Sequence, residues 1–213
     1  MGSLVLEMMG LTIAVVGWVG VILACALPMW EVSAHIHSSI VTAQTHWEGL
    51  WMSCVIQSTG QMQCKVFDSV LSLPSVTQVG RALSVVASIL GIIALLVTVV
   101  GAQFTVCLKG SSLKSRFVFA GGVMYVLTGL LVLIPLCWTA NKVIKDFFDP
   151  NVSPSQKREM GASLYVGWAA SALLFLGGVL ICLSSRGQLA QPVKYSPSRR
   201  PTSNGDYDKK NYV

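Results

Sequence analysis

Residues 30–64 of the chain read WEVSAHIHSSIVTAQTHWEGLWMSCVIQSTGQMQC. Over residues 30–37 apolar and polar side chains alternate strictly, which is typical of a β-strand with one covered face. Cys54 and Cys64 enclose the turn-forming tetrad QSTG between two short runs that can pair as a hairpin. Two cysteines that face each other across such a hairpin can form a disulfide and fix its register. Because an apolar run ending at Pro28 comes directly before, we interpret the stretch as a small sheet that caps a membrane-spanning helix.

The composition of the chain indicates a membrane protein. Of its 213 residues, 53% are hydrophobic and 11% are charged, against about 25% charged residues in a soluble domain. The sequence also contains four long runs without a charged residue. Four runs of this kind disfavour a large soluble helical core, and the first run lacks the basic region of a cleavable signal peptide. Each run is at least as long as the roughly 20 residues that cross a bilayer. The uncharged stretches are residues 8–30, 82–108, 117–141 and 160–185.

Four spans divide the chain into inner and outer segments. We expect the third helix to continue outward toward Phe147 and to end before Pro150, and we expect a short helix over residues 67–73. The tail is rich in Ser, Pro, Gly, Lys and Arg and is predicted to be disordered. The predicted segments are 1–7 (N-terminus), 8–28 (first span), 29–81 (first outer loop), 82–103 (second span), 104–116 (inner loop), 117–138 (third span), 139–161 (second outer loop), 162–184 (fourth span) and 185–213 (tail).

The distribution of charge predicts the orientation. Residues 109–116 contain three basic side chains and no acid, and the tail after residue 185 contains six basic and two acidic ones. A basic excess is typical of cytoplasmic segments, and a disulfide between Cys54 and Cys64 persists only in an oxidising compartment. We therefore expect both termini in the cytoplasm and the first loop outside the cell. The net charge of +6 follows this inner excess and indicates contact with lipid headgroups, with no nucleic-acid partner.

The predicted spans exclude several classes of function. They contain no ionisable residue, and a transporter or proton pump usually needs one at mid-depth. No cluster of His, Asp or Cys lies in the spans or the inner loop, so the sequence predicts no enzyme and no cofactor. His35 and His37 share one strand face, which we interpret as solvated, and metal ligation by Cys54, Cys64 and a histidine is the less favoured alternative to the disulfide. Arg81 begins the second span, where we expect its side chain to reach out to the membrane interface.

The outer region resembles a known family. Trp30, Gly49-Leu50-Trp51, Cys54 and Cys64, followed by Arg81, resemble the W-GLW-C-C signature of claudins. The resemblance covers nearly the whole chain, and it is especially close to the epithelial barrier claudins that serve as enterotoxin receptors. It implies an α-helical membrane protein with a left-handed four-transmembrane-helix bundle and a small antiparallel extracellular sheet of about five strands. It also implies tight-junction strands in the epithelial plasma membrane, built by contacts in cis and in trans, and no enzymatic activity. The alternative is a non-junctional auxiliary or regulatory four-span protein of the wider superfamily.

By this resemblance, Lys65 lies where claudins set charge selectivity. A unit charge about 4 Å from an ion is worth on the order of 1 kcal/mol in water and about 4 kcal/mol at an intermediate dielectric. One lysine in a narrow pore would therefore disfavour cations. Residues 31–80 of this loop also contain Glu31, Glu48 and Asp68, so that one base against three acids gives a net charge of −2. We favour a cation barrier, and anion permeation stays open.

Two adjacent aromatic residues, Phe147 and Phe148, lie on the second outer loop. One helix face does not bury both, so we expect one of them to contact a partner. In claudins such aromatics form a pocket for an apolar side chain of the next protomer. The resemblance implies that Val70 is this side chain here and that Met160 belongs to the pocket.

The resemblance also places Asp149-Pro150-Asn151-Val152 at the enterotoxin-binding motif. Asp149 stands in place of asparagine, and Asn151 in place of the apolar residue that fills the toxin pocket. Losing one buried apolar side chain costs roughly 1.5–3 kcal/mol. We therefore expect binding of clostridial enterotoxin to be weakened.

Two further expectations concern the cytoplasmic side. Tyr212 and Val213 end the chain, and a terminal Val with a free carboxylate can bind a PDZ domain by strand addition, which by resemblance implies zonula occludens scaffold proteins as partners. Cys107 and Cys182 lie at the inner ends of the second and fourth spans, where palmitoylation is plausible.

Overall fold

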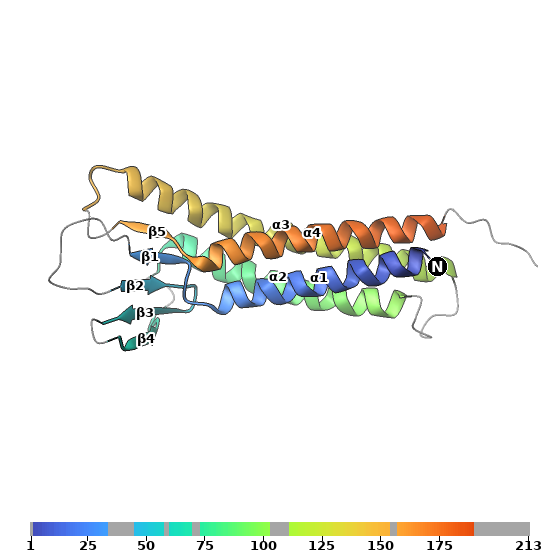
Figure 1. The fold of residues 1–213 in the computed structure, drawn as a ribbon, viewed down its shortest axis with the longest axis horizontal. Coiled ribbons are helices and arrows are strands. Elements are labelled where there is room, and N and C mark those ends of the chain that lie inside the picture. The colour runs from blue at the N-terminus through green and yellow to red at the C-terminus, as the bar shows by residue number, and fades with distance from the viewer. Residues whose placement is uncertain are drawn as a thin grey trace, which may run out of the picture.

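The computed structural model describes residues 2–33, 45–57, 60–69, 73–102, 111–153 and 157–189. Within them, a bundle of four helices carries one five-stranded sheet at one end (Figure 1). The helices are α1 (Gly2–Ala26), α2 (Ser75–Gly101), α3 (Ser111–Phe148) and α4 (Ala162–Leu189). The strands are β1 (Glu31–Ser33), β2 (Thr45–Glu48), β3 (Met52–Ile56), β4 (Met62–Val66) and β5 (Arg158–Met160).

All four helices contain a stretch that is long and apolar enough to cross a membrane. At a rise of 1.5 Å per residue, about 20 residues cross a hydrocarbon core of roughly 30 Å, and the shortest of these stretches has 23 residues. Many large apolar side chains on the outside of the bundle are exposed, as expected where lipid replaces water. The stretches are Leu4–Ala26, Ser75–Gly101, Leu113–Phe148 and Ala162–Arg186.

The helices extend beyond the predicted spans. α1 begins at Gly2 and not at residue 8, so Glu7, expected before the first span, lies within an apolar helix and is only 1% exposed. α2 begins at Ser75, seven residues before the predicted start. α3 continues to Phe148, as the sequence predicted, and it passes beyond the other helices to lie beside the sheet (Figure 1).

Small and hydroxyl-bearing residues lie in the interior of the bundle beside larger buried side chains such as Tyr125 and Leu136. Ala14, Ala87 and Ala94 are fully buried, and so are Thr98 and Thr128. Both threonines donate a hydrogen bond to a carbonyl four residues earlier in their own helix, which satisfies their hydroxyl groups without a partner helix. The helices therefore pack through close backbone approach, as is typical of bundles in lipid.

The sheet combines both outer segments of the chain. Its strand order is β4-β3-β2-β1-β5, and every pair is antiparallel. β5 comes from the segment between α3 and α4, so the second outer segment adds the edge strand next to β1. Residues directly opposite each other share a face of the sheet. One such row contains Cys64, Cys54, Trp47, Val32 and Glu159, and the adjacent row on the other face contains Lys65, Ser53, Glu48, Glu31 and Met160.

Two predictions about the first outer segment need correction. The alternation from Trp30 predicted a strand with Glu31 on its uncovered face, but β1 covers Glu31–Ser33 and the Glu31 side chain is buried. It is buried because two basic side chains from other elements reach it, as described below. Of the helix expected over residues 67–73, residues 70–72 lie outside the described part, and residues 67–69 and 73 are not helical.

Candidate functional site

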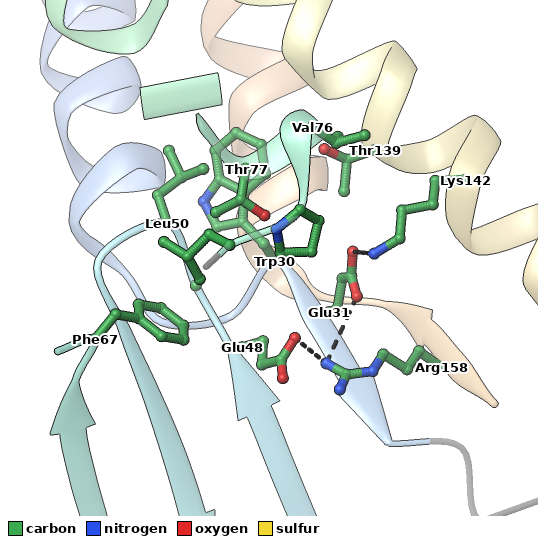
Figure 2. Close-up of a pocket in the computed structure, with 13 residues that line it drawn as sticks. Trp30, Glu31, Glu48, Leu50, Phe67, Val76, Thr77, Thr139, Lys142 and Arg158 are labelled. Atoms are coloured by element: carbon green, nitrogen blue, oxygen red, sulfur yellow. Dashed lines mark hydrogen bonds and ion pairs between the residues drawn. The ribbon is translucent and has the colours of Figure 1, made fainter. Parts of the chain in front are cut away.

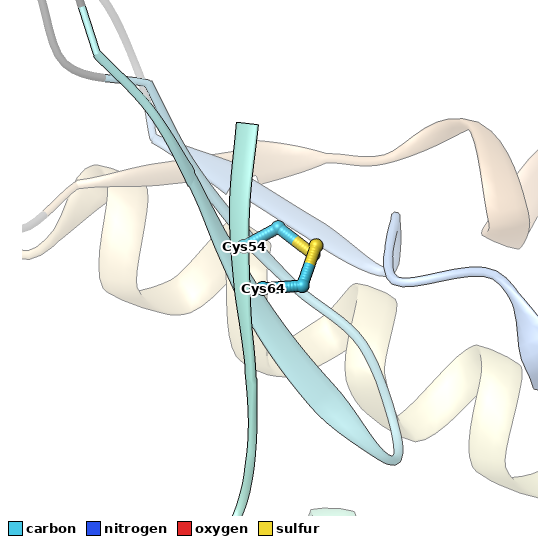
Figure 3. The surroundings of a disulfide bond; sticks show 2 residues. All are labelled: Cys54 and Cys64. Atoms are coloured by element: carbon cyan, nitrogen blue, oxygen red, sulfur yellow. A yellow bond between two sulfur atoms is a disulfide. The ribbon is translucent and has the colours of Figure 1, made fainter. Parts of the chain in front are cut away.

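The predicted disulfide is present and fixes the hairpin. Cys54 on β3 and Cys64 on β4 lie directly opposite each other, with their Cα atoms 4.0 Å apart and an S–S bond of 2.00 Å (Figure 3). The turn between the strands contains Gly60 at a φ of 77°, a left-handed conformation that glycine adopts without a Cβ clash. The hairpin and its register were therefore correctly predicted from the spacing of the two cysteines.

Arg81 joins the sheet to the bundle. The sequence predicted that its side chain would reach out to the membrane interface. This prediction was wrong, because Arg81 is buried near the start of α2 and is only 8% exposed. Its Nε donates a hydrogen bond to the carbonyl oxygen of Leu50, and its guanidinium carbon lies 5.3 Å from the ring centroids of both Trp51 and Phe67. The guanidinium is thus placed between the segment before β3 and the segment after β4. A cation–π contact that is shielded from water is stronger than an exposed one.

Both signature tryptophans bind the outer end of α1. Trp30 is buried, and its Nε1 donates to the carbonyl oxygen of Ala24 over 2.8 Å. The Nε1 of Trp51 lies 3.4 Å from the Sγ of Cys25, to which it donates. These contacts, with that of Arg81, give the signature residues a structural role: they hold the sheet against the helix ends.

Two glycines permit close backbone approach at this junction. A Cβ on Gly49 would lie 2.4 Å from the Cα of Pro28, and a Cβ on Gly161 would lie 2.0 Å from the carbonyl oxygen of Met29. The backbone N–H of Gly161 donates to the carbonyl oxygen of Trp30 over 2.9 Å. Any side chain at either position would push the sheet away from the end of α1.

Four charged residues form a cluster that the sequence analysis missed (Figure 2). Lys142 on α3 places its Nζ 3.1 Å from Oε1 of Glu31, and Nη1 of Arg158 on β5 lies 3.6 Å from Oε2 of the same carboxylate. Arg158 also pairs with Glu48 on β2. The Glu31 side chain is 10% exposed. We name Glu31, Glu48, Lys142 and Arg158 the charge cluster.

The charge cluster changes the electrostatic balance predicted for the first outer loop. The sequence count set Glu31 and Glu48 against Lys65, but both acids are paired with bases from outside that loop. The Lys142–Glu31 pair spans 111 positions in the sequence, and no local pattern reveals it. Lys65 instead pairs with Asp68, over 2.5 Å between Nζ and Oδ2.

An apolar pocket of about 320 Å³ opens between α3, β5 and the start of α4. It brings together Phe147, Phe148 and Met160, three of the four residues that the sequence analysis assigned to a protomer contact. The two rings pack edge to face with centroids 5.5 Å apart, and Phe148 remains 77% exposed. Such an exposed ring beside an open apolar pocket is typical of an interaction site. The other lining residues are Val143, Ile144, Arg158, Glu159 and Tyr165.

The segment that the resemblance places at the toxin motif forms a turn after α3. Oδ1 of Asp149 accepts a hydrogen bond from the backbone N–H of Asn151 over 2.9 Å, and the backbone N–H of Asp149 donates to the carbonyl oxygen of Lys145. Pro150 and Asn151 are exposed, and Val152 is half-buried. Asp149 thus closes the turn, a role that asparagine also performs.

Cys182 lies against α3. Its Sγ is 3.8 Å from the carbonyl oxygen of Phe119 and would meet a Cβ on Gly122 at 2.7 Å. Palmitoylation there would require the thiol to leave this contact, and it stays a prediction. Four other predicted site residues, Val70, Cys107, Tyr212 and Val213, lie outside the described residues, as do His35 and His37. Among the described residues, no group of three or more His, Cys, Asp or Glu could hold a metal ion.

Comparison with known proteins identifies relatives along the whole chain. Residues 4–181 match the PMP-22/EMP/MP20/Claudin family. The chain is 57% identical to Claudin-5 of Mus musculus over 218 residues, which cover 100% of both proteins. It is 55% identical to Claudin-4 of Bos taurus, covering 96% of this chain and 99% of the relative. It is 50% identical to Claudin-6 of Homo sapiens, covering 100% of both.

Proposed function

Since this chain belongs to the PMP-22/EMP/MP20/Claudin family and is a multi-pass claudin of tight junctions, we propose that its outer sheet seals the space between neighbouring cells and disfavours the passage of cations. Family membership assigns it to structural proteins of the junction that assemble with other claudins in the membrane. The single observation that carries the proposal is the common sheet. Both outer segments contribute strands to it, and the apolar pocket lies at its β5 edge.

We propose that the sheet faces the extracellular space and that both termini are cytoplasmic. The disulfide on β3 and β4 supports this orientation because it needs an oxidising compartment. Labelling of intact cells with a membrane-impermeant maleimide tests it. Lys65→Cys is expected to react from outside, and Lys114→Cys only after permeabilisation. The opposite pattern would invert the proposed topology.

The apolar pocket is proposed to receive an apolar side chain of the next protomer, for which Val70 is the candidate. An apolar pocket of about 320 Å³ has room for one such side chain. Phe148→Ala removes a ring that is largely exposed, so the fold should survive the change. Freeze-fracture of non-junctional cells expressing the chain is expected to show continuous fibrils at contacts for the wild type and short, sparse ones for Phe148→Ala.

A matched control removes an exposed apolar side chain elsewhere on α3. Leu130 is 47% exposed within the span, and Leu130→Ala is expected to leave the fibrils unchanged. Fibrils of normal length in Phe148→Ala would remove the pocket from the assembly. No fibrils from the wild type would contradict strand formation by this chain alone.

Lys65 is proposed as the residue that disfavours cations. It lies on the edge strand β4 with its side chain 75% exposed, so it is available to ions outside the protein. Dilution potentials across a transfected leaky monolayer measure the sodium-to-chloride permeability ratio. Lys65→Asp is expected to raise that ratio, and an unchanged ratio would exclude Lys65 from the ion pathway.

Two partners are proposed for the remaining segments. The chain end at Tyr212 and Val213 would bind PDZ domains of zonula occludens scaffold proteins, which a pull-down with and without the last residue tests. Clostridial enterotoxin would bind weakly, because the exposed Asn151 offers no apolar side chain to the pocket of the toxin. Asn151→Leu is expected to strengthen toxin binding. Equal binding by both proteins would contradict this reading of the motif.

A further inference from the structure

Lys65, the proposed selectivity residue, pairs with an acidic residue just beyond the end of its own strand, β4. Nζ of Lys65 lies 2.5 Å from Oδ2 of Asp68, three residues later, and the two side chains are 75% and 76% exposed. Every residue of β4 is exposed, and β4 is an edge strand of the sheet. An ion passing this edge therefore meets both charges of the pair, and not the lysine alone.

The position of Asp68 follows from the anchoring of the residue before it. The ring of Phe67 lies 5.3 Å from the guanidinium carbon of buried Arg81. This contact holds the chain where it leaves β4, and the next residue, Asp68, turns its carboxylate toward Lys65. Lys65, Asp68 and Ser53 line one open hollow of about 260 Å³. The pair is thus supported by the sheet-to-bundle junction.

The other acids on the Lys65 face of the sheet already have partners. Glu48 and Glu31 lie in the same cross-strand row as Lys65. Both pair with Arg158, and Glu31 also pairs with Lys142. Asp68 is therefore the acid whose charge acts most directly on Lys65.

We propose that Asp68 sets the effective charge of Lys65 and so determines the charge selectivity of the barrier; this inference rests on the proposed role of Lys65. In water, the local concentration of a cation about 6 Å from an isolated ammonium is lowered about threefold. A carboxylate only about 2 Å farther from that cation reduces the depletion to about 1.3-fold. The neutral pair is then a weak barrier, and Lys65 becomes a strong one when Asp68 is neutralised.

A double-mutant cycle in a transfected leaky monolayer tests the proposal, with the sodium-to-chloride permeability ratio as the readout. Asp68→Asn is expected to lower the ratio about two- to fivefold, because both ions respond to the unmasked lysine and salt screens part of the effect. Lys65→Gln is expected to raise it by about two- to tenfold, since Asp68 is then unopposed. The double variant is expected to return to within about twofold of the wild type.

Controls separate this inference from the proposal on which it rests. Surface biotinylation and freeze-fracture confirm that each variant reaches the membrane and forms strands. Asp146→Asn removes an acid from α3, which lies beside the opposite edge of the sheet, and should leave the ratio unchanged. If Lys65→Gln shifts the ratio and Asp68→Asn does not, Asp68 has no such role and Lys65 keeps its own. If neither single variant shifts it, the role of Lys65 fails, and the inference with it. A shift with Asp146→Asn equal to that with Asp68→Asn would also overturn the inference.

Discussion

Replacing Arg81 with alanine tests how the outer sheet is held on the bundle. The substitution removes the hydrogen bond from Nε to the carbonyl oxygen of Leu50 and the contacts of the guanidinium with Trp51 and Phe67. It leaves the carbonyl of Leu50 without its charged donor in a buried position. We expect the sheet to lose its attachment to α2 before the helices themselves unfold.

The cost follows from the contacts. A hydrogen bond from a charged donor contributes about 1.5–3 kcal/mol. Each of the two cation–π contacts adds about 0.5–1 kcal/mol, because the rings of Trp51 and Phe67 are themselves partly exposed. Removing a buried charge returns part of this, because among the described residues Nη2 of Arg81 has no hydrogen-bond partner. The expected net loss is about 2–4 kcal/mol, or roughly 5–15 °C in the thermal midpoint of a protein of this size.

The assay is thermal unfolding of the purified protein in detergent, followed by tryptophan fluorescence. Arg186 provides the matched control, since its guanidinium carbon lies 5.8 Å from the ring centroid of Phe119 but the residue is exposed. Arg186→Ala is expected to cost less than about 1 kcal/mol. A midpoint for Arg81→Ala within 2 °C of the Arg186→Ala midpoint would refute the junction role of Arg81.

The remaining predictions concern the charge cluster, the junction and the disulfide. Glu31→Gln leaves two bases without their buried counter-charge and should cost about 1–2 kcal/mol, since both bases are partly solvated; a thermal midpoint equal to the wild type would contradict the cluster. Gly161→Ala places a Cβ 2.0 Å from a backbone oxygen and should abolish surface expression. Gly60→Ala meets no atom within 4 Å and should cost only about 1–2 kcal/mol through its φ of 77°; equal expression of the two variants would argue against a steric cause. Replacing Cys54 and Cys64 together by serine removes a cross-link between residues 10 positions apart and should cost about 2–3 kcal/mol. The measurement is unfolding with and without reductant, and a wild type insensitive to reductant would contradict this value.

The spans, the cysteine hairpin and the long third helix could be predicted from local sequence, whereas the five-stranded sheet was implied only by the resemblance to claudins. Four uncharged runs, each longer than the roughly 20 residues that cross a bilayer, predicted the spans. This prediction needs no tertiary information, because hydropathy is a sum over neighbouring residues. The hairpin between Cys54 and Cys64 and the continuation of α3 to Phe148 followed from turn residues, cysteine spacing and the prolines after the helix. Two adjacent aromatics at the end of a helix also predicted that one ring would stay exposed, and Phe148 is 77% exposed; the pocket itself was implied only by the resemblance to claudins.

The tertiary structure alone decided which charges act. Glu31 is buried because Lys142 and Arg158, more than 100 residues away, meet it across two strands and a helix. Arg81 is buried for a similar reason: its partners come from segments on either side of the β3–β4 hairpin. The energy of an ion pair depends on distance and solvent exposure in space, and neither is a local property of the sequence. A count of charges along the first loop therefore gave the wrong electrostatic balance, because the bases that pair with Glu31 and Glu48 lie outside that loop.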